Sequence, residues 1–172
     1  MIERSGLITV SGKEMTVVGE NLRPGDLAPT FTAQSQDFSD IDVLSATKGK
    51  VRILTALPSL STSVCDRETR RFNEEAASLA KDIAIIAIST DLPYTQKNWC
   101  SAAGVDQVTV VSDHMHADFG SKYGCLIKEM RILRRSVFVV DRSGIVRYAA
   151  YMPALGIEPD YAAVLEAARK AL

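Results

Sequence analysis

The chain has 172 residues, 47% of them hydrophobic, and its 20 basic and 21 acidic side chains nearly cancel. This length favours a single domain over residues 1–172, and the balanced charge offers no basic surface for nucleic acid. No apolar run approaches the length of a membrane span and the N-terminus lacks the apolar centre of a secretory signal, so we expect a soluble, cytoplasmic protein without a membrane partner.

Short strands at 7–10 and 14–18, on either side of Gly12, predict an N-terminal hairpin over about residues 6–18. Further along the chain the pattern predicts edge strands at 31–33 and 41–43, a buried strand at 51–57, a helix from Ser63, a buried strand at 83–88, a helix from Pro93 to about Ala102, a strand at 108–111, a short helix at 115–122, a hairpin of 136–140 and 145–150, and a helix opened by Pro159 and ending near Lys170. This alternation predicts an α/β sandwich whose central sheet is covered by helices on both faces.

The helix from Ser63 has an apolar side and a charged side. Its periodicity places Val64, Arg67 and Phe72 on the packed side. The charged residues expected to face water are Arg70, Arg71, Glu74 and Glu75.

Three cysteines, Cys65, Cys100 and Cys125, are too few for a disulfide framework. In a reducing compartment a disulfide that does form is usually transient, catalytic or sensing. The chemistry of these sulfurs is therefore of more interest than any role in stapling the fold.

Cys65 follows a strand that ends at Pro58 and a helix that starts near Thr62 or Ser63, so it lies in the first helical turn. Free backbone N–H groups and the positive end of the helix dipole favour a thiolate there. An ordinary cysteine, with a pKa of about 8.5, is roughly 3% thiolate at pH 7, so full ionisation gains only about thirtyfold. A fast reaction would therefore also need donors aimed at the bond that breaks in the substrate, and the Thr62 hydroxyl can be one. We expect the Cys65 sulfur to face solvent.

A cation is also expected near the sulfur. Arg134 and Arg135 precede the apolar strand 136–140, and their side chains point to opposite faces of an alternating strand. Only one of them can address Cys65, and periodicity alone leaves the choice open.

Pro58, Thr62 and Cys65 match the Pro-x-x-x-Thr-x-x-Cys motif of the peroxiredoxins, and the wider string Pro-Ser-x-x-Thr-x-Val-Cys resembles their thiol peroxidase subfamily, of the atypical 2-Cys type. The resemblance covers nearly the whole chain, including the N-terminal hairpin. It continues through the segments 72–77, 88–94, 99–100, 118–124, 135–141 and 158–161.

The resemblance implies a thioredoxin-like fold of the peroxiredoxin type, with a central mixed sheet flanked by helices. It implies a peroxidase without a cofactor or metal that reduces hydrogen peroxide and organic hydroperoxides. Cys65 matches the peroxidatic cysteine, Cys100 the resolving cysteine, Thr62 the active-site hydroxyl, Arg135 the arginine, and Pro58 the residue that shields the pocket. Such proteins are usually homodimers recycled by thioredoxin or a similar dithiol.

The implied cycle carries Cys65 to a sulfenic acid and then to an intrachain disulfide with Cys100. The two cysteines are 35 positions apart on different helices. Because a disulfide needs Cα atoms within about 7 Å, we predict that the first turn around Cys65, the helix around Cys100, or both unwind locally.

Each of these residues has a plainer interpretation. Cysteine is often a small buried hydrophobe, and Cys125, among Tyr123, Leu126 and Ile127, is best interpreted as packing. Arg135 could be a solvated charge at a strand edge, and Thr62 a helix cap.

Two other functions use the same residues. The disulfide could serve as a redox sensor without high turnover. A metal-binding module would use Cys65, Cys100, His114 and His116, but two histidines without a matched second pair fall short of a zinc set, and a capping or surface role suits them better.

Overall fold

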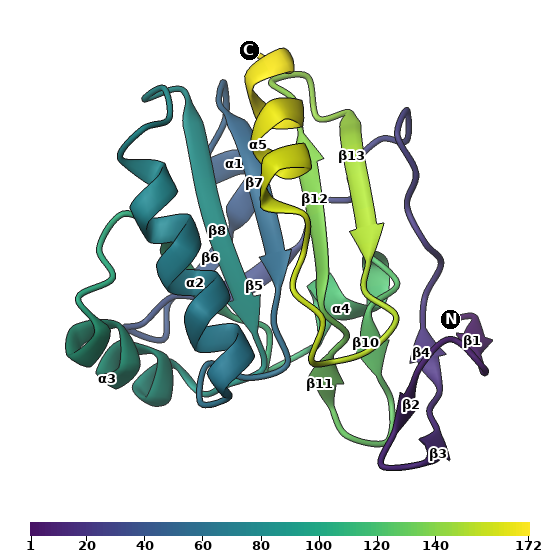
Figure 1. Ribbon diagram of the computed structural model, residues 1–172. Coiled ribbons are helices and arrows are strands. Elements are labelled where there is room, and N and C mark those ends of the chain that lie inside the picture. Colours follow the sequence, from purple (N-terminus) through teal and green to yellow (C-terminus); the bar gives the residue numbers. More distant parts are fainter.

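The computed structural model describes all 172 residues (Figure 1). Its centre is a seven-stranded sheet in the order β13-β12-β7-β8-β9-β5-β6. The strands are β5 (Thr32–Gln34), β6 (Asp40–Asp42), β7 (Val51–Ala56), β8 (Ile83–Ser89), β9 (Thr109–Ser112), β12 (Ser136–Val140) and β13 (Val146–Tyr151). Strands β7, β8 and β9 run parallel and the other neighbours antiparallel, which confirms the predicted mixed sheet. The central strands β7 and β8 are buried on both faces because helices cover both.

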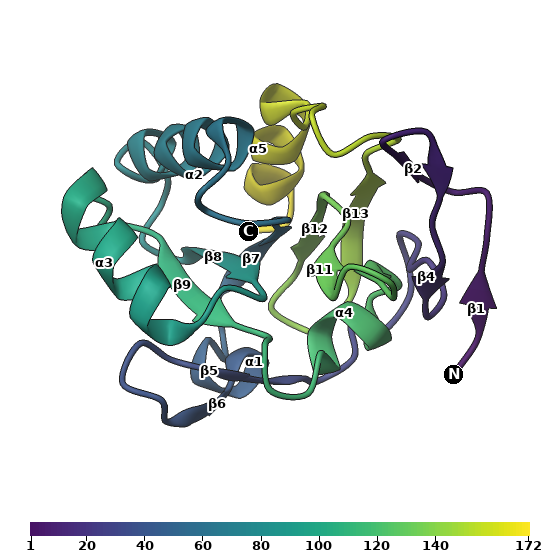
Figure 2. The ribbon, with the colours of Figure 1, turned by 90° about the horizontal axis from the view of Figure 1, so that it is seen from below.

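Five helices flank the sheet: α1 (Val43–Ala46), α2 (Ser63–Ala76), α3 (Pro93–Ala103), α4 (Asp118–Lys122) and α5 (Tyr161–Lys170). Helices α2 and α5 lie together on one face, with α3 beside α2, and α1 and α4 lie on the other face (Figure 2). Each face has its own core, and the α/β sandwich expected from the sequence is confirmed.

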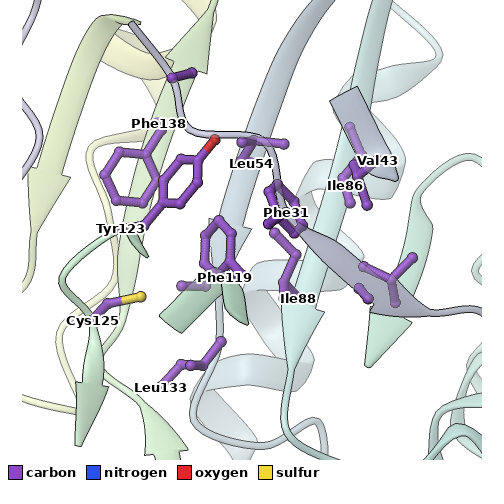
Figure 3. Close-up of a cluster of buried hydrophobic side chains, with 14 of the residues drawn as sticks. Phe31, Val43, Leu54, Ile86, Ile88, Phe119, Tyr123, Cys125, Leu133 and Phe138 are labelled. Atoms are coloured by element: carbon purple, nitrogen blue, oxygen red, sulfur yellow. The ribbon is translucent and has the colours of Figure 1, made fainter. Parts of the chain in front are cut away.

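The core on the α1 and α4 face is rich in aromatic rings (Figure 3). Phe31 meets Phe119 and Tyr123 edge-on, with ring centroids 4.8 and 5.5 Å apart. The Tyr123 hydroxyl donates to the Pro29 carbonyl, so this buried ring keeps a partner for its polar end. Cys125 lies at the edge of this core with its side chain fully buried.

The N-terminal residues form small antiparallel strands beside the main sheet. Strands β2 (Thr9–Val10) and β3 (Lys13–Glu14) make a hairpin, as predicted. The predicted second strand, 14–18, is divided, because β4 (Val17–Val18) pairs with β1 (Glu3–Arg4) and β10 (Leu126–Ile127) instead. Strand β10 also pairs with β11 (Ile132–Leu133). Val17 and Val18 are buried by this pairing.

Some sequence expectations differ from the structure. Helix α4 begins at Asp118, later than expected, and α1, β1, β10 and β11 were not predicted. On α2 the packed side is formed by Cys65, Glu68, Thr69 and Phe72, while Arg67 is exposed. The expectation for Arg67 was therefore wrong, since periodicity in apolar residues misses a buried carboxylate. No helix is long and apolar enough to cross a membrane.

Candidate active site

The loop from Pro58 to Thr62 joins strand β7 to helix α2 and delivers Cys65 to the first helical turn. Thr62 is the N-cap, and its hydroxyl oxygen accepts a hydrogen bond of 3.4 Å from the Cys65 backbone N–H. Pro58 is buried at the start of the loop. The sulfur thus lies at the positive end of a helix of fourteen residues.

Arg135 is the arginine that reaches the sulfur. Its Nη2 donates to Cys65 Sγ over 3.2 Å. Arg134 points to the other face, where its Nε donates to the Met152 carbonyl and its guanidinium lies over the Tyr151 ring. Strand β12 begins directly after Arg135 and pairs with β7, so the sheet brings the arginine beside the loop that carries Cys65.

A buried carboxylate that the sequence analysis missed orients Arg135. Glu68, one turn after Cys65 on α2, accepts hydrogen bonds from Arg135 Nη1 and from the Thr55 hydroxyl. The Leu155 carbonyl accepts from Nε and Nη2 of the same guanidinium. Only the spacing from Cys65 to Glu68, which places both on one helix face, could have indicated this residue.

The contacts of the buried pair Arg135 and Glu68 determine the directions in which the pKa values of the two side chains shift. Burial opposes the charge of Arg135, but Glu68 and Cys65 outweigh it and raise the pKa of the guanidinium. Burial raises the pKa of the Glu68 carboxyl, and Arg135 and Thr55 act against that rise. A guanidinium stays protonated in proteins, so a fixed positive charge lies against the Cys65 sulfur.

Cys65 does not face solvent, and this expectation was wrong. Its side chain is 0% exposed. An open cleft of about 420 Å³ is lined by the residues around the start of α2 and by Trp99 from α3, but Cys65 itself does not line it. The Cys65 side chain is part of the hydrophobic core on this face of the sheet, but its sulfur also accepts a hydrogen bond from the charged Arg135.

Cys100 lies on α3 with 8% of its surface exposed. Its sulfur accepts a 3.4 Å hydrogen bond from Gln36 Nε2, in the loop between β5 and β6. Burial raises the pKa of the Cys100 thiol, and the Gln36 contact acts against the rise. All three cysteines are unpaired thiols.

Cys125 and the two histidines lie apart from this site. Burial raises the pKa of the Cys125 thiol well above its ordinary value, and this sulfur belongs to the core on the opposite face of the sheet from Cys65. His114 Nε2 is 2.7 Å from Gln34 Oε1. No group of three or more histidine, cysteine or acidic side chains is arranged to hold a metal ion.

Comparison with known proteins places these residues in a family. The sequence pattern described as the AhpC/TSA family matches residues 24–149. A thiol peroxidase of Bacillus subtilis (strain 168) is 46% identical over 162 residues, which are 94% of this chain and 96% of the relative. A thiol peroxidase of Halalkalibacterium halodurans is 44% identical over 165 residues, or 96% and 98% of the two chains.

Solved structures agree with the sequence comparison. The crystal structure of a peroxiredoxin-like protein from Aquifex aeolicus superposes with a TM-score of 0.87 at 32% identity, covering 98% of this chain and 99% of that one. A thiol peroxidase from Chromobacterium violaceum shares the fold, with a TM-score of 0.81 at 20% identity over 95% of each chain. The chain therefore belongs to the AhpC/TSA family and, within it, to the thiol peroxidases.

Proposed function

We propose that this thiol peroxidase reduces hydrogen peroxide and organic hydroperoxides with Cys65 as the attacking sulfur and Cys100 as its resolving partner. The observation that carries the proposal is the contact between Arg135 and the Cys65 sulfur at the N-terminus of α2. A guanidinium and a helix N-terminus both favour a thiolate over a thiol. They also favour the negative charge that develops on the peroxide oxygens as the O–O bond breaks.

In the first step the Cys65 thiolate attacks one peroxide oxygen. An S–O bond forms, the O–O bond breaks, and the other oxygen leaves as water or an alcohol after taking up a proton. The sulfur is oxidised to a sulfenic acid. Arg135 supplies a donor at the sulfur. The Thr62 hydroxyl, which donates to the Ser59 carbonyl in the reduced protein, would turn to supply a second donor, and the buried Pro58 would shield the pocket.

In the second step the Cys100 thiolate attacks the sulfenic sulfur. The S–S bond forms, the S–O bond breaks, and the oxygen leaves as water. Both thiols start on wound helices, so we expect α3, the first turn of α2, or both to unwind before the sulfurs meet. Thioredoxin or a similar dithiol then reduces the disulfide by exchange.

Mass spectrometry of non-reduced peptides after one equivalent of peroxide tests the pairing directly. The expected product is a Cys65–Cys100 linkage, with Cys125 left as a thiol. Cys65→Ser should abolish turnover. Cys100→Ser should retain one round of peroxide reduction but lose cycling with thioredoxin, and normal cycling by this variant would contradict the resolving assignment.

Stopped-flow oxidation of the reduced protein separates an enzyme from a redox sensor. An enzyme reacts with peroxide orders of magnitude faster than an ordinary free thiol, whereas reaction at the free-thiol rate would favour the sensor. The family resemblance also implies a homodimer, which sedimentation equilibrium of the reduced protein would test.

A further inference from the structure

The helices that carry the two cysteines are joined by the residues next to those cysteines. Asp66 follows Cys65 on α2, and Trp99 precedes Cys100 on α3. The Trp99 indole N–H donates to Asp66 Oδ1 over 3.1 Å. One hydrogen bond therefore connects the immediate neighbours of the two sulfurs.

Arg70 strengthens this connection. Its Nε donates to Asp66 Oδ2 over 2.9 Å, and its Nη1 donates to the Ala103 carbonyl over 3.0 Å. Its guanidinium carbon is 5.7 Å from the centroid of the Trp99 ring. Ala103 is the last residue of α3, so Arg70 holds that helix on both sides of Cys100.

Arg71, the next residue, makes the same kinds of contact but none with α3. It pairs with Glu75 one turn along α2 and lies 5.7 Å from the Tyr161 ring of α5. The two arginines match in charge, in helical ion pairing and in their contact with an aromatic ring. They differ in the helix that they contact, because Arg70 contacts α3 and Arg71 contacts α5.

We propose that Arg70 is a positioning residue that, with Asp66 and Trp99, keeps α3 wound in the reduced protein and so limits how fast Cys100 reaches the oxidised Cys65. This inference rests on the proposed function. The contacts hold both ends of the segment that contains Cys100, so unwinding this segment must break them. Their strength adds to the barrier for disulfide formation.

A slower second step gives the sulfenic acid a longer life. In that time a second peroxide can transfer an oxygen to the same sulfur, giving a sulfinic acid and releasing water or an alcohol. Sulfinic acid does not condense with a thiol, so the protein is inactivated. Stronger Arg70 contacts therefore stabilise the reduced protein but make it more easily inactivated by excess peroxide.

The test compares the wild-type protein with Arg70→Ala and the matched control Arg71→Ala. Each reduced protein receives one equivalent of peroxide, is quenched by acid at increasing times, and is analysed for the Cys65–Cys100 linkage. For Arg70→Ala we expect linkage formation to be about three- to tenfold faster, the combined effect of losing a cation–π contact and a hydrogen bond to α3 at the surface. Arg71→Ala should match the wild type.

A second variant, at Trp99 on α3, tests whether the acceleration comes only from destabilising α2. Trp99→Phe keeps a ring under Arg70 but removes the indole N–H, and should speed linkage formation by about two- to threefold. With excess peroxide, Arg70→Ala should also yield less sulfinic acid at Cys65 than the wild type.

Linkage formation in Arg70→Ala at or below the wild-type rate would overturn the inference. Equal acceleration in Arg71→Ala would do the same, because it would show a general effect of removing charge from α2. Failure of the proposed function would look different, since the wild-type protein itself would then form no Cys65–Cys100 linkage.

Discussion

Arg135 donates a hydrogen bond to the Cys65 sulfur, and we propose that the reactivity of Cys65 depends on it. Nη1 and Nη2 contact Glu68 and Cys65 respectively, while the Leu155 carbonyl accepts from Nε. The sequence narrowed the cation to Arg134 or Arg135 but could not decide between them. The family resemblance indicated Arg135, and the structure places it against the sulfur.

Arg135→Ala is expected to slow the reaction of Cys65 with peroxide by about ten- to hundredfold. A hydrogen bond to a charged group contributes roughly 1.5–3 kcal/mol, and each 1.36 kcal/mol is tenfold in rate. Stopped-flow measurement of the first oxidation step checks this. Arg134→Ala is the matched control, because its side chain lies on the other face with Tyr151 and Met152. A larger loss in Arg134→Ala would reverse the roles of the two residues.

Glu68 illustrates what sequence patterns miss at the residue scale. A glutamate among Arg67, Thr69 and Arg70 looks like part of a charged surface, yet its side chain is 0% exposed. Burial is tolerated because Arg135 and Thr55 both donate to the carboxylate. Such pairing between distant parts of the chain depends on the fold and cannot be derived from local periodicity.

Glu68→Ala should lower the free energy of unfolding by about 3–5 kcal/mol, because it leaves the guanidinium of Arg135 buried without its counter-charge. Urea denaturation measures this change. Glu75→Ala removes a carboxylate from a surface pair with Arg71 on the same helix and should cost less than about 1 kcal/mol. Equal losses in the two variants would contradict the importance of the buried pair.

At the scale of elements, the long apolar strands and the capped start of α2 were predictable. The start of α2 near Thr62 and the strands at 83–88 and 136–140 follow from turn residues and period. The two-residue strands β1, β10 and β11 were not predicted, because the sheet that they form with β4 joins remote segments of the chain. The start of α4 was also misjudged, since it depends on tertiary contacts of Asp113.

Asp113 connects the end of β9 to α4. Its carboxylate accepts hydrogen bonds from the backbone N–H groups of Phe119 and Gly120, at 3.0 and 2.8 Å. Burial raises the pKa of the Asp113 carboxyl to about 6 from 3.8, with these N–H groups acting against the rise. The folded protein therefore binds a proton here more tightly than the unfolded chain does.

This difference predicts a pH dependence of stability. The contribution of Asp113 is fully present below about pH 4 and is lost as the pH rises through about 6, a change of up to about 3 kcal/mol. Asp113→Asn cannot ionise, so the stability of the wild type relative to this variant should fall between pH 4 and pH 7. Urea denaturation of both proteins across this range tests it, and a constant difference would contradict it.

At the scale of the whole molecule, the length of the chain predicts one domain over residues 1–172, and this stays a prediction. Two cores share the seven-stranded sheet, one on each face, so loss of either should expose the other. We expect a single cooperative urea transition with the same midpoint by circular dichroism and by fluorescence of Trp99, the only tryptophan. Two separate midpoints would show that the N-terminal strands or one core unfold independently.

The strand order has a consequence for the catalytic cycle. Arg135 directly precedes β12, and the loop before Cys65 follows β7; these strands are neighbours inside the sheet and pair along five residues. Cys100 instead comes from a helix at the periphery. In the proposed cycle the cation is thus held by the central sheet while α3 unwinds and rewinds, so we expect the charged partner of Cys65 to be in place again before the next peroxide arrives.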